Sequence, residues 1–205
     1  MFYFVKTPWL ISAAFTHYIW EIDTQEKVIF LTFDDGPHPV ATDYVLNQLK
    51  LFNAHATFFC VAKNVKEFPE LYSRILNEGH GVGNHTFNHL NGWKVRDKKY
   101  LNDISEAIKY IDSKLFRPPY GKLSKFQAQQ IAAFGLHIVM WTVLSGDFDK
   151  KISPEKCRNN VILNAKEGSI VVFHDSEKAF PRMQQALPEV LKYFTEKGFT
   201  FKALN

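Results

Sequence analysis

Residues Val28–Pro37 read VIFLTFDDGP, and this segment carries the strongest fold signal in the chain. Its first six residues form an unbroken run of apolar and β-branched side chains, which is typical of a strand buried on both faces. Two adjacent carboxylates, Asp34 and Asp35, follow the run, and Gly36-Pro37 then turns the chain. A buried strand that ends in acidic side chains indicates a sheet whose functional groups lie at the carboxyl ends of its strands.

The same alternation of a short apolar run and an amphipathic helix repeats along the chain. We expect further strands over 56–61, 81–84, 115–117, 136–142, 169–174 and 199–202. We expect helices over 40–52, 68–78, 96–114, 123–134 and 183–197, with one more that begins at Ser153-Pro154-Glu155. Repeated β-α-β units require right-handed crossovers and a mainly parallel sheet, so the chain is expected to be an α/β protein.

Polar residues just after the strands distinguish a barrel from an open sheet. They are Asp34-Asp35, His85, Arg117, Asp147 and His174-Asp175. In a barrel the loops after all strands meet over one face, whereas an open sheet would spread them along an edge. We therefore expect a single-domain distorted (β/α) barrel with about seven β/α units. Residues 28–205 would form the catalytic domain, and residues 1–27 an N-terminal segment packed on it.

The composition is that of an ordinary globular protein. Of 205 residues, 46% are hydrophobic and 22% charged, which allows a full core. The net charge is +4, but Lys and Arg are scattered among acids, so no nucleic-acid partner is expected. Cys60 and Cys157 are far apart and neither belongs to a CxxC motif, so no disulfide framework is implied.

The N-terminal stretch MFYFVKTPWLISAAF does not have the pattern of a signal peptide. It has no basic leading region, and Lys6 and Pro8 interrupt its apolar residues. It is also too short to span a bilayer. We expect this stretch to pack on the domain. The alternative is that it contacts a membrane surface through Phe2, Phe4 and Trp9. A cytoplasmic or membrane-peripheral location is therefore expected.

The motif TFDDGP, from Thr32 to Pro37, is the first that carries chemistry. Adjacent strand residues point to opposite sides, so Asp34 and Asp35 need not do the same job. Two carboxylates behind a buried strand would cost desolvation free energy unless a cation or hydrogen-bond donors meet them. The alternative is a simple turn, because Asp-Gly-Pro is turn chemistry.

The motif HTFNH places His85 and His89 four residues apart. On one face of a helical turn they could bind one metal, and one carboxylate would complete a His₂Asp site with open positions for water. The Gly-rich residues before His85 favour this reading because they allow a sharp backbone turn. The alternative is a chance pair in a chain with eight histidines.

Three further segments lie after predicted strands. In RPPYG, the planar guanidinium of Arg117 suits a carboxylate partner. In WTVLSGDFD, Asp147 could pair with Arg117, and aromatic rings could form the base of a sugar-binding site. In IVVFHDS, His174 follows a buried strand and is expected at the same end of the barrel. The alternatives are a rigid loop with a surface Arg, a core Trp and a structural His.

TFDDGP, H-T-x-x-H, RPPYG, the W…GDF segment and the F-H-D strand end occur in this order. Together they resemble the five motifs of the polysaccharide deacetylase family, also called the NodB homology domain or carbohydrate esterase family 4, from about Val28 to the C-terminus. The resemblance implies a distorted (β/α) barrel and one divalent metal. Asp35, His85 and His89 would bind it; the metal is usually Zn²⁺ in this family, with Co²⁺, Ni²⁺ and Mn²⁺ as alternatives.

The resemblance also implies roles in proton transfer. Asp34 would be the general base, Arg117 would orient Asp34, and Asp147 would hold Arg117. His174 would be the general acid. These roles suit amide hydrolysis, which needs an activated water and a protonated leaving amine.

The remaining implied roles concern the substrate. The backbone N–H of Tyr120 would help bind the oxyanion, and Phe148 and Val172 would form the pocket for the acetyl methyl group. The sequence departs from the family at Phe148, usually Trp, at Leu144, often Asp, and at Val82, frequently Glu. None of these departures removes a ligand or a proton-transfer group. They do mean that the family pattern does not define the shape of the substrate groove, or the substrate, in this chain.

The expected function is a metal-dependent hydrolase that removes acetyl groups from N-acetylated amino sugars in a glycan of the chitooligosaccharide or peptidoglycan type. One alternative keeps the chemistry and changes the bond, as in an O-acetyl esterase on acetylated xylan or a deformylase on an amino sugar. Another is a non-catalytic carbohydrate-binding module on the same fold, for which Asp34 and His174 would have no use.

Overall fold

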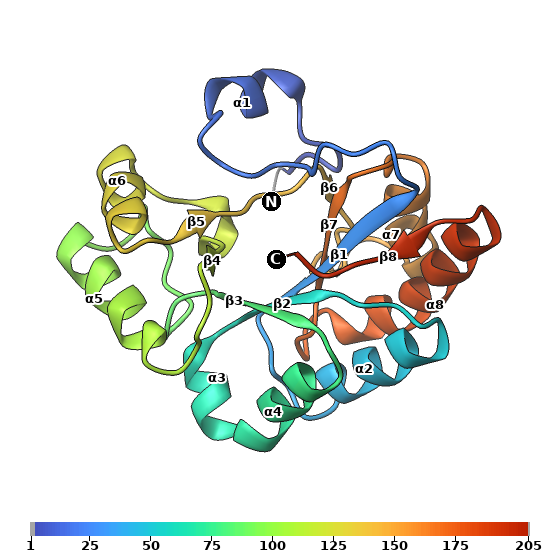
Figure 1. Ribbon diagram of the computed structural model, residues 1–205, viewed down its shortest axis with the longest axis horizontal. Helices are drawn as coiled ribbons and strands as arrows, with labels where there is room; N and C mark the ends of the chain where they lie inside the picture. Colours follow the sequence, from blue (N-terminus) through green and yellow to red (C-terminus); the bar gives the residue numbers. More distant parts are fainter. Residues whose placement is uncertain (1–2, 205) are drawn as a thin grey trace.

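A computed structural model describes residues 3–204 of the chain, so Phe2 lies outside the described residues. Its centre is a curled sheet in which all strand pairs are parallel (Figure 1). The strands are β1 (Val28–Asp34), β2 (Thr57–Cys60), β3 (Gly81–Asn84), β4 (Leu115–Phe116), β5 (His137–Ile138), β6 (Val143–Leu144), β7 (Ile170–His174) and β8 (Thr200–Phe201). Their order is β5-β4-β3-β2-β1-β7-β6, and β8 pairs with the first residues of β1.

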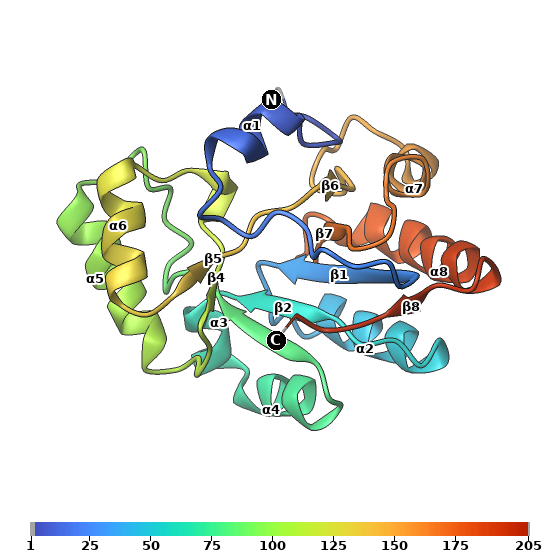
Figure 2. The ribbon, with the colours of Figure 1, turned by 45° about the horizontal axis from the view of Figure 1, so that its top comes forward.

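Helices lie around the outer side of this sheet, except the first, which lies across the opening between β5 and β6 (Figures 1 and 2). They are α1 (Trp9–Ala14), α2 (Ala41–Leu51), α3 (Ala62–Glu67), α4 (Pro69–Asn77), α5 (Asp97–Ile108), α6 (Lys125–Ala133), α7 (Pro154–Ile162) and α8 (Phe180–Glu196), with a 3₁₀ turn at Pro119–Gly121. Parallel strands linked by outer helices confirm the predicted single-domain α/β fold. The sheet curls into a half-open barrel, which is the predicted distortion.

The central strand β1 is buried on both faces, which explains its continuous apolar run. Ile29, Leu31 and Phe33 face the helices, and Phe33 stacks between Phe58 and Phe173 with ring centroids 5.2 and 6.1 Å away. The alternate residues Val28 and Phe30 belong to a second apolar cluster on the concave side. Asp34 continues this alternate set, so the period of two directs it toward the interior of the half-barrel.

The barrel is open between β5 and β6, and one sequence prediction was wrong there. The strand expected over 136–142 stops at Ile138, and the chain forms β6 only from Val143. Between these two strands the backbone forms hydrogen bonds with the N-terminal segment. The Ile19 N–H donates to the Ile138 carbonyl at 2.8 Å, and the Met140 N–H donates to the Ile19 carbonyl at 2.7 Å. Pairing with a segment remote in sequence thus replaced the continuation of a local strand.

The N-terminal segment covers both ends of the open sheet (Figure 2). Ile19 bridges to Val139 beyond β5, and Lys6 bridges in antiparallel fashion to Val143 of β6. These bonds satisfy backbone groups that an uncovered edge strand would expose. Among residues 3–204, none of the helices is long and apolar enough to cross a membrane.

The other predicted helices are present, but their first and last residues differ from the predicted ones. The helix predicted over 96–114 ends at Ile108, because Ser113 turns the chain into β4 by donating its hydroxyl to the Val82 carbonyl and accepting the Leu115 N–H. The six-residue helix α3 was not predicted, because it is too short to show a helical period. Ser153 caps α7 as expected, accepting the Lys156 N–H at 3.1 Å.

Candidate active site at the carboxyl ends of the strands

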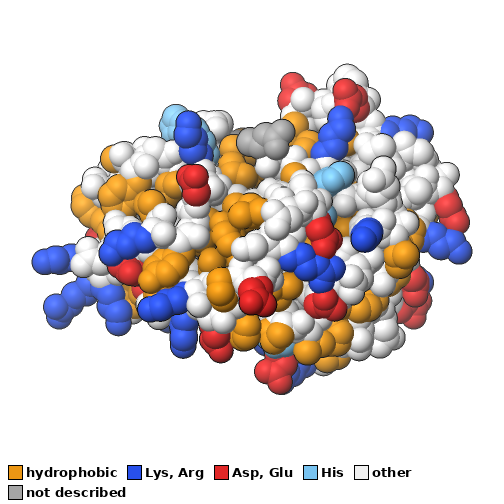
Figure 3. Space-filling view, turned by 60° about the horizontal axis from the view of Figure 1, so that its bottom comes forward, with side chains coloured by type: hydrophobic (Ala, Val, Ile, Leu, Met, Phe, Trp, Pro, Cys, Tyr) orange, Lys and Arg blue, Asp and Glu red, His pale blue; other side chains and the backbone are white. Residues whose placement is uncertain are grey.

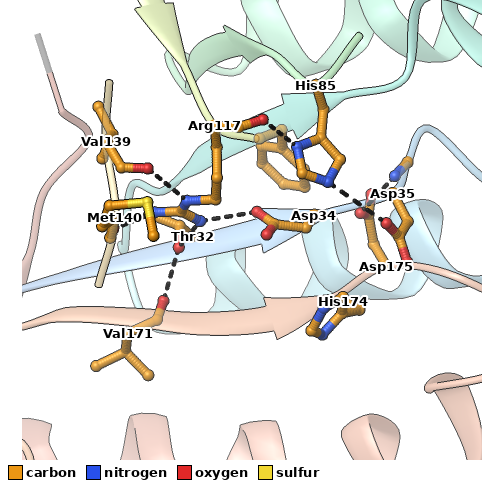
Figure 4. Close-up of polar contacts among 12 residues, drawn as sticks. Thr32, Asp34, Asp35, His85, Arg117, Val139, Met140, Val171, His174 and Asp175 are labelled. Carbon is orange, nitrogen blue, oxygen red and sulfur yellow. Dashed lines mark hydrogen bonds and ion pairs between the residues drawn. The ribbon is translucent and has the colours of Figure 1, made fainter. Parts of the chain in front are cut away.

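The polar residues singled out in the sequence gather where the strands of the half-barrel end (Figure 4). Asp34 is the last residue of β1, and His174 is the last of β7. His85 follows β3, and Arg117 follows β4. The parallel topology therefore brings side chains from four strand ends to one region, as expected of a (β/α) barrel.

Asp35, His85 and His89 form a compact set of ligand atoms. One such atom from each lies within 4.8 Å of the others. The Asp35 Oδ1 atom is 3.0 Å from His89 Nε2 and 3.7 Å from His85 Nε2. One carboxylate and two imidazoles are a donor set that suits Zn²⁺ and leaves coordination positions for water and substrate. These three residues could hold a metal ion.

The protonation of His85 and Asp35 fits that use. His85 Nδ1 lies 2.7 Å from the Arg117 carbonyl, so Nδ1 carries the proton and Nε2 keeps its lone pair toward Asp35. Burial lowers the pKa of His85 to about 4, which keeps the ring neutral. Burial opposes the charge of Asp35, but the hydrogen bond from His89 and the nearby histidines hold its pKa well below its usual range.

The HTFNH segment is not the helical turn predicted from its spacing. Thr86 and His89 have φ values of 65° and 55°, which no α-helix contains. Side-chain bonds replace the helical ones here: Asn84 Oδ1 accepts the Thr86 N–H at 2.8 Å. The imidazoles of His85 and His89 still lie close together, because the positive φ values turn the loop back on itself where a helix would have continued.

Asp103 of α5 fixes this loop from outside. Its buried carboxylate accepts the backbone N–H groups of Phe87 and Asn88, both at 2.9 Å, and the Asn88 side-chain amide at 2.6 Å. These residues lie between the two histidines. The sequence prediction missed Asp103, although an acid on the apolar face of a helix, beside Tyr100 and Ile104, was an available signal.

Asp175 supports the turn that carries Asp35. The Asp35 backbone has φ 83°, and the Gly36 N–H donates to Asp175 Oδ1 at 3.0 Å. A Cβ at Gly36 would lie 2.0 Å from Asp175 Oδ2, so only glycine allows this approach. The Thr42 hydroxyl donates to the same carboxylate, and burial raises the pKa of Asp175 to about 8.

Arg117 is fully buried and directed at Asp34 (Figure 4). Its Nη1 lies 2.7 Å from Asp34 Oδ1 and 2.7 Å from the Thr32 hydroxyl. Its other nitrogens donate to the Val139 carbonyl at 3.2 Å and the Met140 carbonyl at 2.9 Å. The planar fork is thus bound on every side, and its face covers the Phe59 ring at 4.0 Å.

The predicted pairing of Asp147 with Arg117 was wrong. The fully buried Asp147 carboxylate instead lies 2.7 Å from His174 Nδ1 and accepts the His174 backbone N–H at 2.6 Å. Two backbone carbonyls take the place at Arg117 that Asp147 was expected to occupy. Burial opposes the charge of His174, but Asp147, with Asp35 and Asp34 beyond it, raises its pKa to about 10.

The residues predicted to contact substrate lie around these groups. The ring of Tyr120, half exposed and with φ 61°, is 4.8 Å from that of His89. The Phe148 ring is 5.2 Å from His174 in an edge-on arrangement. Val172 is buried in β7, two residues before His174 and therefore on the same side of the sheet.

A half-open parallel barrel with a carboxylate and two imidazoles gathered at its strand ends defines a (β/α)-barrel protein with a candidate metal site on the face where such folds build active sites. The sequence model of the polysaccharide deacetylase family matches residues 21–139, more than half of the chain. The chain therefore belongs to the polysaccharide deacetylase family, which confirms the family expected from its motifs.

Named relatives and solved structures agree with this assignment. The chain is 36% identical to a peptidoglycan-N-acetylglucosamine deacetylase of Bacillus cereus over 192 residues, which cover 91% of this chain and 90% of that protein. It is 34% identical to a chitooligosaccharide deacetylase of Azorhizobium caulinodans, covering 75% of this chain and 76% of the relative. A crystal structure of the Bc1960 peptidoglycan N-acetylglucosamine deacetylase superposes with a TM-score of 0.85 at 31% identity, covering 97% of this chain and 95% of that one.

Proposed function

We propose that the protein is a metal-dependent hydrolase that removes acetyl groups from N-acetylated amino sugars of a glycan. One observation carries this proposal. A carboxylate held by Arg117 and an imidazole held by Asp147 lie on neighbouring strands beside the three candidate metal ligands. A protein that only bound sugar would need neither a base nor an acid in this place.

A divalent ion such as Zn²⁺, held by Asp35, His85 and His89, would supply an acidified water and polarise the carbonyl of the acetamide. Asp34 would act as the general base. Arg117 binds its Oδ1, which leaves Oδ2 as the oxygen that takes the proton of the attacking water. The four hydrogen bonds of Arg117 prevent it from following the substrate, so the carboxylate keeps its direction.

His174 would be the general acid. Its Nδ1 proton is shared with Asp147, so Nε2 is the atom that donates to the leaving nitrogen. The raised pKa keeps this ring protonated at neutral pH. The backbone N–H of Tyr120 would donate to the oxyanion, and Phe148 and Val172 would bound the pocket for the acetyl methyl group.

The names of the relatives support the proposed substrate class. Those quoted above are named for deacetylation of peptidoglycan N-acetylglucosamine and of chitooligosaccharides. Both substrates are N-acetylated amino-sugar polymers, and we propose the same class here. An O-acetylated polysaccharide is the alternative, because the same water activation would cleave an ester.

Acetate release tests the proposal. The zinc-loaded protein is expected to release acetate from chitooligosaccharides or peptidoglycan fragments, and a chelator is expected to stop the reaction. Asp34→Asn should abolish release, whereas Asp43→Asn, at an exposed pair with Arg74, should retain it. Metal-loaded protein that is inert on every N-acetylated and O-acetylated glycan would overturn the proposal. Release from O-acetylated glycans alone would favour the esterase.

A further inference from the structure

The N-terminal segment reaches the candidate general acid through two aromatic contacts. Tyr3 packs against the edge of Phe148, with ring centroids 5.1 Å apart and an interplanar angle of 63°. Phe148 in turn packs on His174, with centroids 5.2 Å apart at 72°. A residue at the start of the chain is therefore one ring away from the proton donor.

The backbone beside Tyr3 is anchored independently of the ring. The Val5 carbonyl accepts the Leu144 N–H at 2.8 Å, and the Thr7 N–H donates to the Thr142 carbonyl at 2.9 Å. The segment thus pairs with β6 in antiparallel fashion at the Lys6–Val143 bridge, and the loop after β6 carries Asp147 and Phe148. The position of Tyr3 relative to this loop is set by main-chain pairing.

The loop after β6 is shaped to receive the Tyr3 side chain. The Tyr3 hydroxyl donates to Asp149 Oδ2 at 3.2 Å. A Cβ at Gly146, where φ is 81°, would lie 3.0 Å from the Tyr3 hydroxyl oxygen. Burial and the Asp149 carboxylate raise the pKa of Tyr3 to about 12, so its hydroxyl stays a donor. Tyr3 therefore contacts this loop both before and after Asp147.

Two rings and one ammonium group among residues 3–204 lie against the Phe148 ring. The ring is partly buried, and the third of these groups, the Lys178 ammonium, lies 5.8 Å from its centroid. Lys178 is a flexible side chain and would not stop the ring from swinging outward. Tyr3 is the rigid body that lies behind Phe148.

We propose that Tyr3 is a positioning residue, which keeps Phe148 against His174 and thereby limits the movement of the acid ring that Asp147 holds and sets the width of the acyl pocket. The catalytic consequence rests on the function proposed above, whereas the effect on His174 does not. The N-terminal segment would thus belong to the working site and not only to the scaffold.

Nuclear magnetic resonance of histidine-labelled protein tests the positioning without any substrate. The His174 ring resonance, identified by its loss in His174→Gln, is expected to shift in Tyr3→Leu because Phe148 moves. It should stay in place in Tyr3→Phe, which keeps the ring, and in Trp9→Leu, a change at an exposed residue of the same segment. If Tyr3→Leu does not fold, Tyr3→Met, with a longer flexible side chain, replaces it.

Kinetics test the consequence. Tyr3→Leu is expected to lower kcat for an N-acetyl glycan about threefold to tenfold, the loss of one aromatic contact. It should also reduce the preference for N-acetyl over N-propionyl substrate, which a general loss of stability would not do. Combining Tyr3→Leu with Phe148→Leu should add no further loss, because Tyr3 acts through Phe148.

Two results would overturn the inference: an unmoved His174 resonance in folded Tyr3→Leu, or a Tyr3→Phe protein as impaired as Tyr3→Leu. The first result would show that Tyr3 does not hold Phe148 against His174. The second would show that the effect comes from the hydrogen bond with Asp149 and not from the ring. If wild-type protein is inert on acetylated glycans while Tyr3→Leu shifts the His174 resonance, the proposed function fails and the positioning role stands.

Discussion

Asp34 and His174 occupy paired positions in the register of two adjacent parallel strands, β1 and β7. Paired residues of neighbouring strands point to the same side of a sheet, so the proposed base and the proposed acid face one space. Five consecutive residue pairs, from Phe30–Ile170 to Asp34–His174, fix this register. A slip of one residue would turn one of the two side chains toward the helices, so the apolar packing of these strands also specifies the spacing of the proposed catalytic pair.

Arg117→Lys should damage both activity and stability. A lysine can follow Arg117 to Asp34 but cannot also bind Thr32, Val139 and Met140. The carboxylate would lose its fixed direction, and we expect kcat to fall by about a hundredfold or more with a smaller change in KM. Acetate release over a range of substrate concentrations measures the two constants.

The stability of the pair is tested by Arg117→Met, and its matched control is Arg74→Met. Arg74 also pairs with a carboxylate, Asp43, but at a partly exposed site. Exposed pairs contribute about 1 kcal/mol or less, whereas breaking a buried pair costs about 3–5 kcal/mol. Urea denaturation should show a small change for Arg74→Met and a much larger loss for Arg117→Met. Equal losses would contradict the role assigned to the buried pair.

The His174–Asp147 pair should make the stability of metal-free protein depend on pH. The folded-state pKa of His174 is raised to about 10 from 6.5. The folded protein therefore keeps a proton that the unfolded chain releases. The stabilisation is complete below the unfolded pKa of about 6.5 and is lost as pH rises through about 10.

Denaturation in the presence of a chelator measures this dependence. The difference in unfolding free energy between wild type and His174→Gln should be largest near pH 6 and shrink toward pH 10. His137→Gln, at an exposed histidine, should show no such trend. A difference that is constant over the whole range would mean that His174 is not held protonated by Asp147.

The fold and most of the site residues could be predicted from the sequence, because their signals are local. VIFLTF must be buried on both faces, and the polar residues after each strand meet wherever parallel strands end together. The order of the motifs then indicated the family. Asp35, His85 and His89 were named from these signals, and the structure places them together.

The partners of those residues could not be predicted in the same way. Whether Asp147 binds Arg117 or His174 depends on the path of the loop after β6, which sequence spacing does not define. The helical reading of HTFNH failed because Asp103, supplied by another element, bonds the loop backbone. Tyr3 is farther still: it lies 145 positions before Phe148 in a chain of 205 residues, and no local pattern links them.

Asp103 should matter for metal binding although it is not a candidate ligand. Its carboxylate holds the backbone of Phe87 and Asn88 between His85 and His89, so its removal should let the two histidines separate. Outer partners of metal ligands typically change metal affinity by about 10–100-fold, and Asp103→Ala is expected to fall in that range. Zinc titration followed by the melting temperature measures it: wild type should gain about 2.7 kcal/mol at a free zinc concentration a hundredfold above Kd.

Two control variants give the upper and lower limits for this measurement of zinc binding. His89→Gln removes a proposed ligand and should lose nearly all of the zinc-dependent gain. Asp112→Ala removes an exposed carboxylate just beyond the same helix and should bind zinc as wild type does. Asp103→Ala is expected between them, with its melting temperature partly restored at high zinc. If Asp103→Ala melts lower but binds zinc with unchanged affinity, the carboxylate only stabilises the fold, and the geometry of the two histidines is set elsewhere.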